Sequence, residues 1–344
     1  MTAPDDSPGG RHQVPAGAVP DATDEAVRAA AEAEETALLG LAPEAPRRTV
    51  SYGPHPSQLI DYYLPDDTDD TDGTDGAREP GLRVTVLHGG FWREAYDRTH
   101  LSPFAAALAR HGFAVALAEY RRAGGGGGWP ATFEDVSRIV ATAWEDQDTR
   151  NGGPDGAPRT GRPSTGASDR GRHVLLGHSA GGHLALWAAA VCTGVGAGRA
   201  AEAGTDGPAQ SARRTPAVSA APDCVVAVAP VAALGRAHEL GLSRGAVAGL
   251  LGGAGAVAEL LPLTDPLLLP PPAAPVTILH GTADPDVPLA LSRAYAAAAR
   301  RAGARVELRE RPGSGHYAPL TPGTAAFGEL LDALRGFPPE TAAG

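Results

Sequence analysis

The sequence predicts an α/β fold with a mainly parallel central sheet and helices on both of its faces. From residue 82 onward, short apolar runs alternate with longer helical patterns. Strands that are covered on both faces read as continuous apolar runs, because neither side of such a strand meets water. Residues that could carry chemistry follow four of these runs, at Gly89, Ser179, Asp284 and His316. Sheets of this kind bind ligands at the carboxyl ends of their strands, where these four residues would meet.

The individual elements follow from local composition. Two short strands are expected first, over 49–53 and 58–64, because the second segment is rich in Tyr and Ile, which favour strands. Buried strands are then expected over 82–90, 113–118, 174–176, 224–229, 275–280 and 305–310. Helices are expected over 100–110, 131–145, 182–190, 289–302 and 324–334. Residues 235–269 read as short helices and proline-rich turns that could wall a pocket.

A single packed domain is expected over residues 49–344. Residues 1–48 are rich in Ala, Pro and acidic residues, so this N-terminal segment is predicted to be disordered. Polar loop insertions are predicted at 66–81, 148–172 and 194–221, which are dominated by Asp, Gly, Pro, Ser and Arg. The remaining residues are numerous enough to bury a large core.

Composition excludes several classes of function. All 29 basic residues are arginine, against 40 acidic residues and a net charge of −11. No basic stripe marks a nucleic-acid partner, and the absence of lysine excludes a P-loop and a Schiff-base lysine. No dinucleotide fingerprint follows the first parallel strand and the 11 histidines lack metal-ligand spacing. We therefore expect neither a cofactor nor a metal.

Cys192 and Cys224 lie in apolar surroundings, which favours reduced, buried thiols over a disulfide framework. Neither a secretory signal pattern nor an apolar run of membrane-spanning length is evident. A soluble cytoplasmic protein without a membrane partner is the resulting expectation. A homodimer is possible on this sequence.

The segment 173–186 contains Gly177-His178-Ser179-Ala180-Gly181, which is a Gly-X-Ser-X-Gly motif between a strand and a helix. In this context the turn is so tight that the serine takes a strained backbone conformation. A Cβ at either glycine would collide with the neighbouring element. The serine hydroxyl would stand clear of the sheet at a helix N-terminus, which favours developing negative charge. Ser179 is therefore the candidate nucleophile.

Asp284 and His316 follow the serine in the chain order Ser, Asp, His. A serine hydroxyl needs a neighbouring base, and the base needs a carboxylate that orients it. His316 is the candidate base, titrating near the ordinary histidine range of about 6 to 7. Asp284 is the candidate acid, and Asp286 is its competitor two residues later. Asp284 is favoured because it comes sooner after the strand.

The remaining histidines near these motifs are expected to be supporting residues. His183 falls on the helix after the serine and reads as a packing residue. His280 ends a strand and would support the acid loop, while His88 would order the loop that follows it through hydrogen bonds.

A hole for a developing oxyanion completes such a site. It pairs the backbone N–H of the residue after the serine, Ala180, with an N–H from the loop after the third strand. That loop reads His88-Gly89-Gly90-Phe91-Trp92, so Gly90 or Phe91 is the second donor. Trp92 is expected to contact substrate.

Together these motifs resemble the α/β-hydrolase superfamily over nearly all of residues 49–334. More narrowly, HGGFW, GHSAGGHLALWAA and HGTADPDVPLALS resemble the kynurenine formamidase (arylformamidase)-like and carboxylesterase-like branch. Phe91 stands where the HGGG motif of hormone-sensitive-lipase-like esterases has a third glycine. The resemblance implies a serine hydrolase that cleaves carboxylic esters or aryl-formamides of small, largely apolar molecules through an acyl-enzyme.

Two alternatives stay open. The same segments resemble the catalytic domain of prolyl oligopeptidase-type peptidases, although those usually carry a large β-propeller before it. A hydrolase fold that has lost catalysis and serves as a binding module is the other alternative. Such proteins typically lack the nucleophile or the base, and both are present here.

Overall fold

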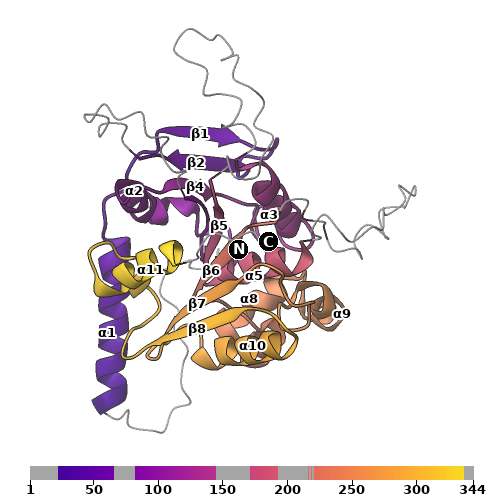
Figure 1. Cartoon of the computed structure of the whole chain (residues 1–344). Helices are drawn as coiled ribbons and strands as arrows, with labels where there is room; N and C mark the ends of the chain where they lie inside the picture. Colours follow the sequence, from indigo (N-terminus) through magenta and orange to yellow (C-terminus); the bar gives the residue numbers. More distant parts are fainter. Residues whose placement is uncertain are drawn as a thin grey trace, which may run out of the picture.

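The computed structural model describes residues 22–65, 82–144, 171–192, 216, 218 and 221–336. Eight strands form one central sheet (Figure 1). The strands are β1 (Arg48–Ser51), β2 (Leu59–Tyr63), β3 (Arg83–Leu87), β4 (Ala114–Ala118), β5 (His173–His178), β6 (Cys224–Val228), β7 (Val276–Gly281) and β8 (Val306–Arg311).

The order of the strands across the sheet is β1-β2-β4-β3-β5-β6-β7-β8. β1 pairs antiparallel with β2, and β2 pairs antiparallel with β4. Every later pair is parallel, from β3 with β4 to β7 with β8. The predicted mainly parallel α/β fold is therefore confirmed. Because β3, β5, β7 and β8 run in the same direction, the loops that follow them open at one edge of the sheet.

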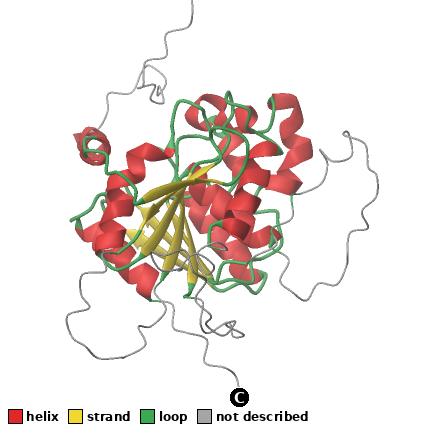
Figure 2. Cartoon of the chain, turned by 90° about the horizontal axis from the view of Figure 1, so that it is seen from above, coloured by secondary structure: helices red, strands yellow, loops and turns green. Residues whose placement is uncertain are grey.

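Helices cover both faces of the sheet (Figure 2). One face carries α1 (Ala22–Leu39), α2 (Ser102–Arg110) and α11 (Ala325–Arg335). The other carries α3 (Ala131–Thr142), α5 (Ala180–Val191), α7 (Leu234–Glu239), α8 (Leu242–Leu250), α9 (Ala254–Thr264) and α10 (Leu289–Arg301). Two short 3₁₀ helices are η2 (Arg98–Leu101) and η4 (Ala318–Leu320).

The continuous apolar runs of the strands supply both cores at once. In β5, Val174 and Leu176 point into the core beneath α2 and α11, while Leu175 points into the core beneath α3 and α5. Successive side chains of a strand face opposite sides of a sheet, so a strand buried on both sides has no polar positions to spare. This explains why β5 reads as apolar up to the residues of the elbow.

The predicted disorder of the N-terminal segment 1–48 is corrected by the structure for residues 22–48. Ala22–Leu39 forms helix α1, and Arg48 begins β1. Helix α1 is rich in Ala and Glu, which favour helix, and Ala31 and Leu38 form a buried stripe against the domain. Leu38 packs in the same core as α11, and α1 contacts the 3₁₀ helix η4 (Ala318–Leu320) that precedes α11.

Several predicted segments lie outside the described residues. These are residues 1–21, the insertion at 66–81 and most of the insertions at 148–172 and 194–221. Within the described part, no single helix is long and apolar enough to cross a membrane. Only α8 and α9 together reach that length and composition, and they are bent by 75° relative to each other.

Docking of α1 can be tested through two adjacent leucines. Leu38 is 1% exposed and Leu39 is 53% exposed. We expect Leu38→Ala to lower the free energy of unfolding by about 2 to 5 kcal/mol, because it leaves a cavity between α1 and the domain. Leu39→Ala is the matched control and should change it by less than about 0.5 kcal/mol. Urea unfolding measures both, and equal effects of the two changes would mean that α1 does not pack as described.

Candidate active site

Ser179 lies in the tight turn between β5 and α5. Its backbone has φ 55° and ψ −115°, a conformation that costs a non-glycine residue on the order of 1 to 3 kcal/mol. Hydrogen bonds hold the turn there, including one of 2.9 Å from the Ser179 N–H to the carbonyl of Val228. A Cβ on Gly177 would lie 2.2 Å from the carbonyl oxygen of Gly181, and one on Gly181 would lie 2.1 Å from that of Leu87. Both glycines are therefore required by close backbone packing.

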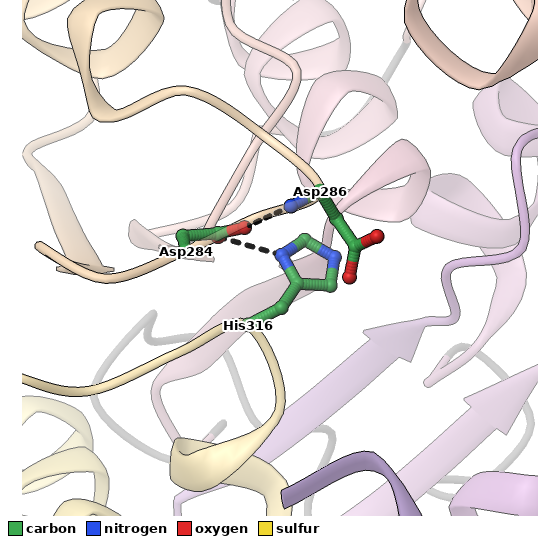
Figure 3. A group of neighbouring side chains, drawn as sticks. All are labelled: Asp284, Asp286 and His316. Carbon is green, nitrogen blue, oxygen red and sulfur yellow. Dashed lines mark hydrogen bonds and ion pairs between the residues drawn. The ribbon is translucent and has the colours of Figure 1, made fainter. Parts of the chain in front are cut away.

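Asp284 and His316 lie together after strands β7 and β8 (Figure 3). The Nδ1–H of His316 donates to Oδ2 of Asp284 over 2.7 Å. Oδ1 of Asp284 accepts the backbone N–H groups of Asp286 at 2.9 Å and Val287 at 2.8 Å. Since Asp284 holds the proton on Nδ1, Nε2 of the neutral ring is free to accept another proton.

Two further histidines hold this pair in place. Nε2 of His280 lies 2.9 Å from the carbonyl of Val287 and 3.3 Å from Oδ2 of Asp284, so it must carry the hydrogen. Its Nδ1 then accepts from the Ser292 hydroxyl at 2.8 Å. His178, the neighbour of Ser179, donates from Nε2 to the carbonyl oxygen of His316 at 3.2 Å. The rings of His178 and His316 lie 4.5 Å apart, which brings the serine turn and the base loop together.

Burial and charge act in opposite directions on these groups. Burial lowers the pKa of His316, but the carboxylate of Asp284, with smaller contributions from Asp286 and Glu34, outweighs it and raises the pKa to about 9. Burial raises the pKa of Asp284, but His316 and His280 bring it well below its ordinary value. Near neutral pH the pair is therefore an imidazolium beside a carboxylate, and the base titrates above the range expected from the sequence.

His178 differs from His316 although the two rings are adjacent. Burial, followed by the positive charge of His316, lowers the pKa of His178 well below its ordinary value. The hydrogen bond from its Nε2 to a carbonyl oxygen requires only the neutral ring. His183 also has a pKa lowered by burial, to about 4, and its Nε2 contacts the Thr264 carbonyl at 2.9 Å. The expectation that His183 is a packing residue is consistent with these contacts.

Asp286 does not contact the Nδ1 side of His316. Its carboxylate lies on the opposite side of the ring, beside Nε2 (Figure 3). Polar atoms of Asp284, Asp286 and His316 all lie within 4.8 Å of one another, a spacing that could hold a metal ion. Asp284, however, is already engaged by His316, His280 and the backbone N–H groups of Asp286 and Val287. This leaves His316 and Asp286 as two ligands, fewer than a protein metal site normally has.

The loop after β3 approaches the serine turn closely. Gly90, Phe91 and Trp92 all have positive φ, at 107°, 57° and 56°. The indole N–H of Trp92 donates to the carbonyl of Ala180 over 3.2 Å, which ties this loop to the first residue of α5. The N–H of Ala180 has no partner within its own helix, as at any helix N-terminus. Phe91 and Ala180 both line the pocket beside Ser179.

A network of buried charged side chains holds the start of this loop in place. His88 is fully buried, with Nδ1 2.7 Å from the carbonyl of Gly89 and Nε2 2.9 Å from Oε1 of Glu119. Glu119 also pairs with Arg122 at 2.9 Å and accepts the backbone N–H of Arg98 at 2.9 Å. Buried charges persist when they are paired and hydrogen-bonded in this way. His88 orders the loop as the sequence predicts.

A narrow pocket lies beside Ser179. Its walls are mostly apolar, with Phe91 and Trp92 on one side and residues of α7 and α8 on the other. This agrees with the expectation that residues 235–269 wall a pocket. Among the described residues that line it, Asp286 is the only charged one.

Sequence reasoning missed one polar residue at the site. Glu34 of α1 accepts the backbone N–H of Gly315 at 2.9 Å and that of Ala318 at 3.2 Å, on either side of His316. The strong helix propensity of the segment was the available signal, because it argued against disorder.

Comparisons with known proteins agree with this fold. The chain is similar to the carbohydrate esterase from gut microbiota, solved in truncated form, with 21% identity, a TM-score of 0.59, and coverage of 86% of this chain and 98% of that one. Esterase B from Lactobacillus rhamnosis has 17% identity and a TM-score of 0.62, with 92% and 95% covered. A thermophilic esterase from Thermogutta terrifontis has 21% identity and a TM-score of 0.53, with 84% and 92% covered.

A search of curated proteins found no match. A family model does match residues 86–327, which span the loop after β3, the serine turn and both loops that carry Asp284 and His316. Together with the eight-stranded sheet and the Ser, Asp, His order of the site, this match establishes that the chain belongs to the alpha/beta hydrolase family.

Proposed function

We propose that the protein is a serine hydrolase that cleaves carboxylic esters of small, largely apolar molecules. The observation that carries this proposal is the hydrogen bond of 2.7 Å between His316 and Asp284, set beside the strained turn of Ser179. A base held in one tautomer by a carboxylate is the arrangement that activates a serine hydroxyl. The similar solved structures named above include three esterases, which supports an ester as the substrate.

In this proposal, the Ser179 hydroxyl attacks the ester carbonyl carbon while Nε2 of His316 takes its proton. The N–H of Ala180 and an N–H from Gly90 or Phe91 stabilise the oxyanion. His316 then gives the proton to the leaving alcohol, and an acyl group remains on Ser179. Water, deprotonated by His316, attacks this acyl-enzyme and releases the acid.

The cavity supports a small substrate without negative charge. Its narrow shape and mostly apolar walls suit a small acyl group. The carboxylate of Asp286 would repel an anionic group there, since charges interact strongly where water is partly excluded. Trp92 lines the cavity beside Ser179, in keeping with the predicted contact with substrate.

Aryl-formamides and prolyl amides are the competing substrate classes. Both require the same serine chemistry, so only turnover separates them from esters. A catalytically silent binding module is the remaining alternative, and it would leave Ser179 unreactive.

Ser179→Ala tests the nucleophile. We expect it to abolish labelling by a fluorophosphonate probe and to lower kcat for p-nitrophenyl butyrate by on the order of 10⁴ to 10⁶-fold, with folding intact. The matched control is Ser137→Ala, because Ser137 is also a buried serine but bonds only the Phe133 carbonyl within α3. Full labelling of Ser179→Ala would remove this serine from the mechanism.

A panel of substrates tests the class and the role of charge. We expect kcat/KM for p-nitrophenyl butyrate to exceed that for the acyl-matched anionic hemisuccinate by about tenfold or more, because of Asp286. It should also exceed that for an N-formyl arylamine and for a prolyl anilide. Asp286→Asn should narrow the difference between the two esters. Faster turnover of the formamide or the anilide would contradict the ester assignment.

A further inference from the structure

Helix α1 reaches the loop that carries the proposed base. The two oxygens of the Glu34 carboxylate accept the backbone N–H groups of Gly315, at 2.9 Å, and Ala318, at 3.2 Å. These N–H groups stand immediately before and shortly after His316. A segment 281 residues away in the sequence therefore binds the base loop from outside the sheet.

The fit between Glu34 and the loop is close. A Cβ on residue 315 would lie 2.7 Å from Oε2 of Glu34 and 3.2 Å from its carboxyl carbon. Real Cβ atoms rarely come so near to other atoms, so a side chain at position 315 would push the Glu34 carboxylate away from the loop. Two backbone N–H groups that bond one carboxylate form a charge-assisted pair, stronger than two bonds between neutral groups.

The other contacts of the loop come from the opposite side. Asp284 holds Nδ1 of His316, and His178 donates to the His316 carbonyl. The carbonyl of Ser314 accepts the N–H of Ala283 at 3.0 Å. All three contacts belong to the sheet and the site. On the helical face the loop is held by Glu34 and by the Thr324 hydroxyl, which donates to the Ala318 carbonyl at 3.0 Å, and of these two contacts only Glu34 holds the backbone N–H groups on both sides of His316.

We propose that Glu34 is a positioning residue, which sets the place of the His316 ring by holding the backbone on both sides of it. The proposal rests on the proposed role of His316 as the base. A displacement of about 1 Å of a reacting group can cost on the order of 10²-fold in rate. Helix α1 is then part of the active site, although its side chains do not reach the substrate cavity.

Charge gives the proposal a second consequence. The titratable groups that face His316 are Asp284 and Asp286 from the loop after β7, His178 from β5, Glu34 from α1 and the neighbouring Tyr317, whose phenol is neutral. Of these, the three carboxylates favour the protonated ring and His178 is neutral. Removing the charge of Glu34 therefore moves the titration of the base to lower pH, in addition to loosening the loop.

The test compares Glu34→Gln with Glu35→Gln, since Glu35 is the next residue of α1 and is exposed. Glu34→Gln keeps the size of the side chain but turns a donor toward one of the two N–H groups. We expect it to lower kcat for p-nitrophenyl butyrate by about 10- to 100-fold at the high-pH plateau, with KM nearly unchanged. The inflection of its pH profile should move to lower pH. Glu35→Gln should match the wild type in all three readouts.

A third variant distinguishes an effect on the stability of the fold from an effect on the position of His316. Leu108→Ala removes a fully buried side chain of α2, outside the site, and should lower the Tm while the folded protein keeps its kcat. A spectroscopic readout is independent of turnover. The Nδ1 proton of His316, seen by NMR in the low-field imidazole region, should shift or broaden in Glu34→Gln and stay in place in Glu35→Gln.

These outcomes distinguish the two levels of the proposal. A Glu34→Gln variant with the plateau kcat, pH inflection and Nδ1 proton signal of Glu35→Gln would overturn the positioning role. An active Ser179→Ala variant would instead overturn the proposed function, and the NMR comparison would still report whether Glu34 holds the His316 loop.

Discussion

The hydrogen bond between Asp284 and His316 is the interaction on which the rest of the site depends. The two residues follow β7 and β8, which are parallel neighbours in the sheet, so their loops must open at the same edge. The carboxylate is buried and would be unstable alone, and the imidazolium beside it supplies the compensating charge. The same pairing raises the pKa of His316. The carboxylate that orients the base therefore also keeps it protonated near neutral pH.

Close backbone packing, and not charged side chains within the cavity, holds the serine turn and the loop after β3 in position. Gly177 and Gly181 let β5, α5 and the carbonyl of Leu87 meet at distances that no Cβ allows. Trp92 then joins the loop to α5 through its indole N–H. Beneath this loop, His88 and Glu119 form a buried pair, and among the described residues that line the cavity only Asp286 is charged. The charged side chains of the site thus lie either behind the loop after β3 or next to His316.

Features that depend on neighbouring residues could be predicted from the sequence. Features that depend on contacts between distant segments could not. The serine turn has glycines at fixed spacing between a strand and a helix, so Ser179 could be located from its neighbours alone. The order of Asp284 and His316 after later strands was also readable. The contact of Glu34 with Gly315 leaves no mark in either segment, because a backbone N–H has no residue-specific signal. The raised pKa of His316 likewise depends on carboxylates from separate segments, which only the folded chain brings together.

The central claim is that Asp284, and not Asp286, orients the base. The measurement that tests it is kcat/KM of Asp284→Asn and Asp286→Asn from about pH 5 to about pH 10, a range that brackets the titration of a histidine. Asp284→Asn should lose activity by on the order of 10⁴-fold at every pH, since the ring loses its tautomer and its charge partner. Asp286→Asn should keep the plateau and shift the inflection to lower pH, which raises kcat/KM near pH 7, because a negative charge beside the imidazolium is gone. Equal losses, or a larger loss in Asp286→Asn, would contradict the account.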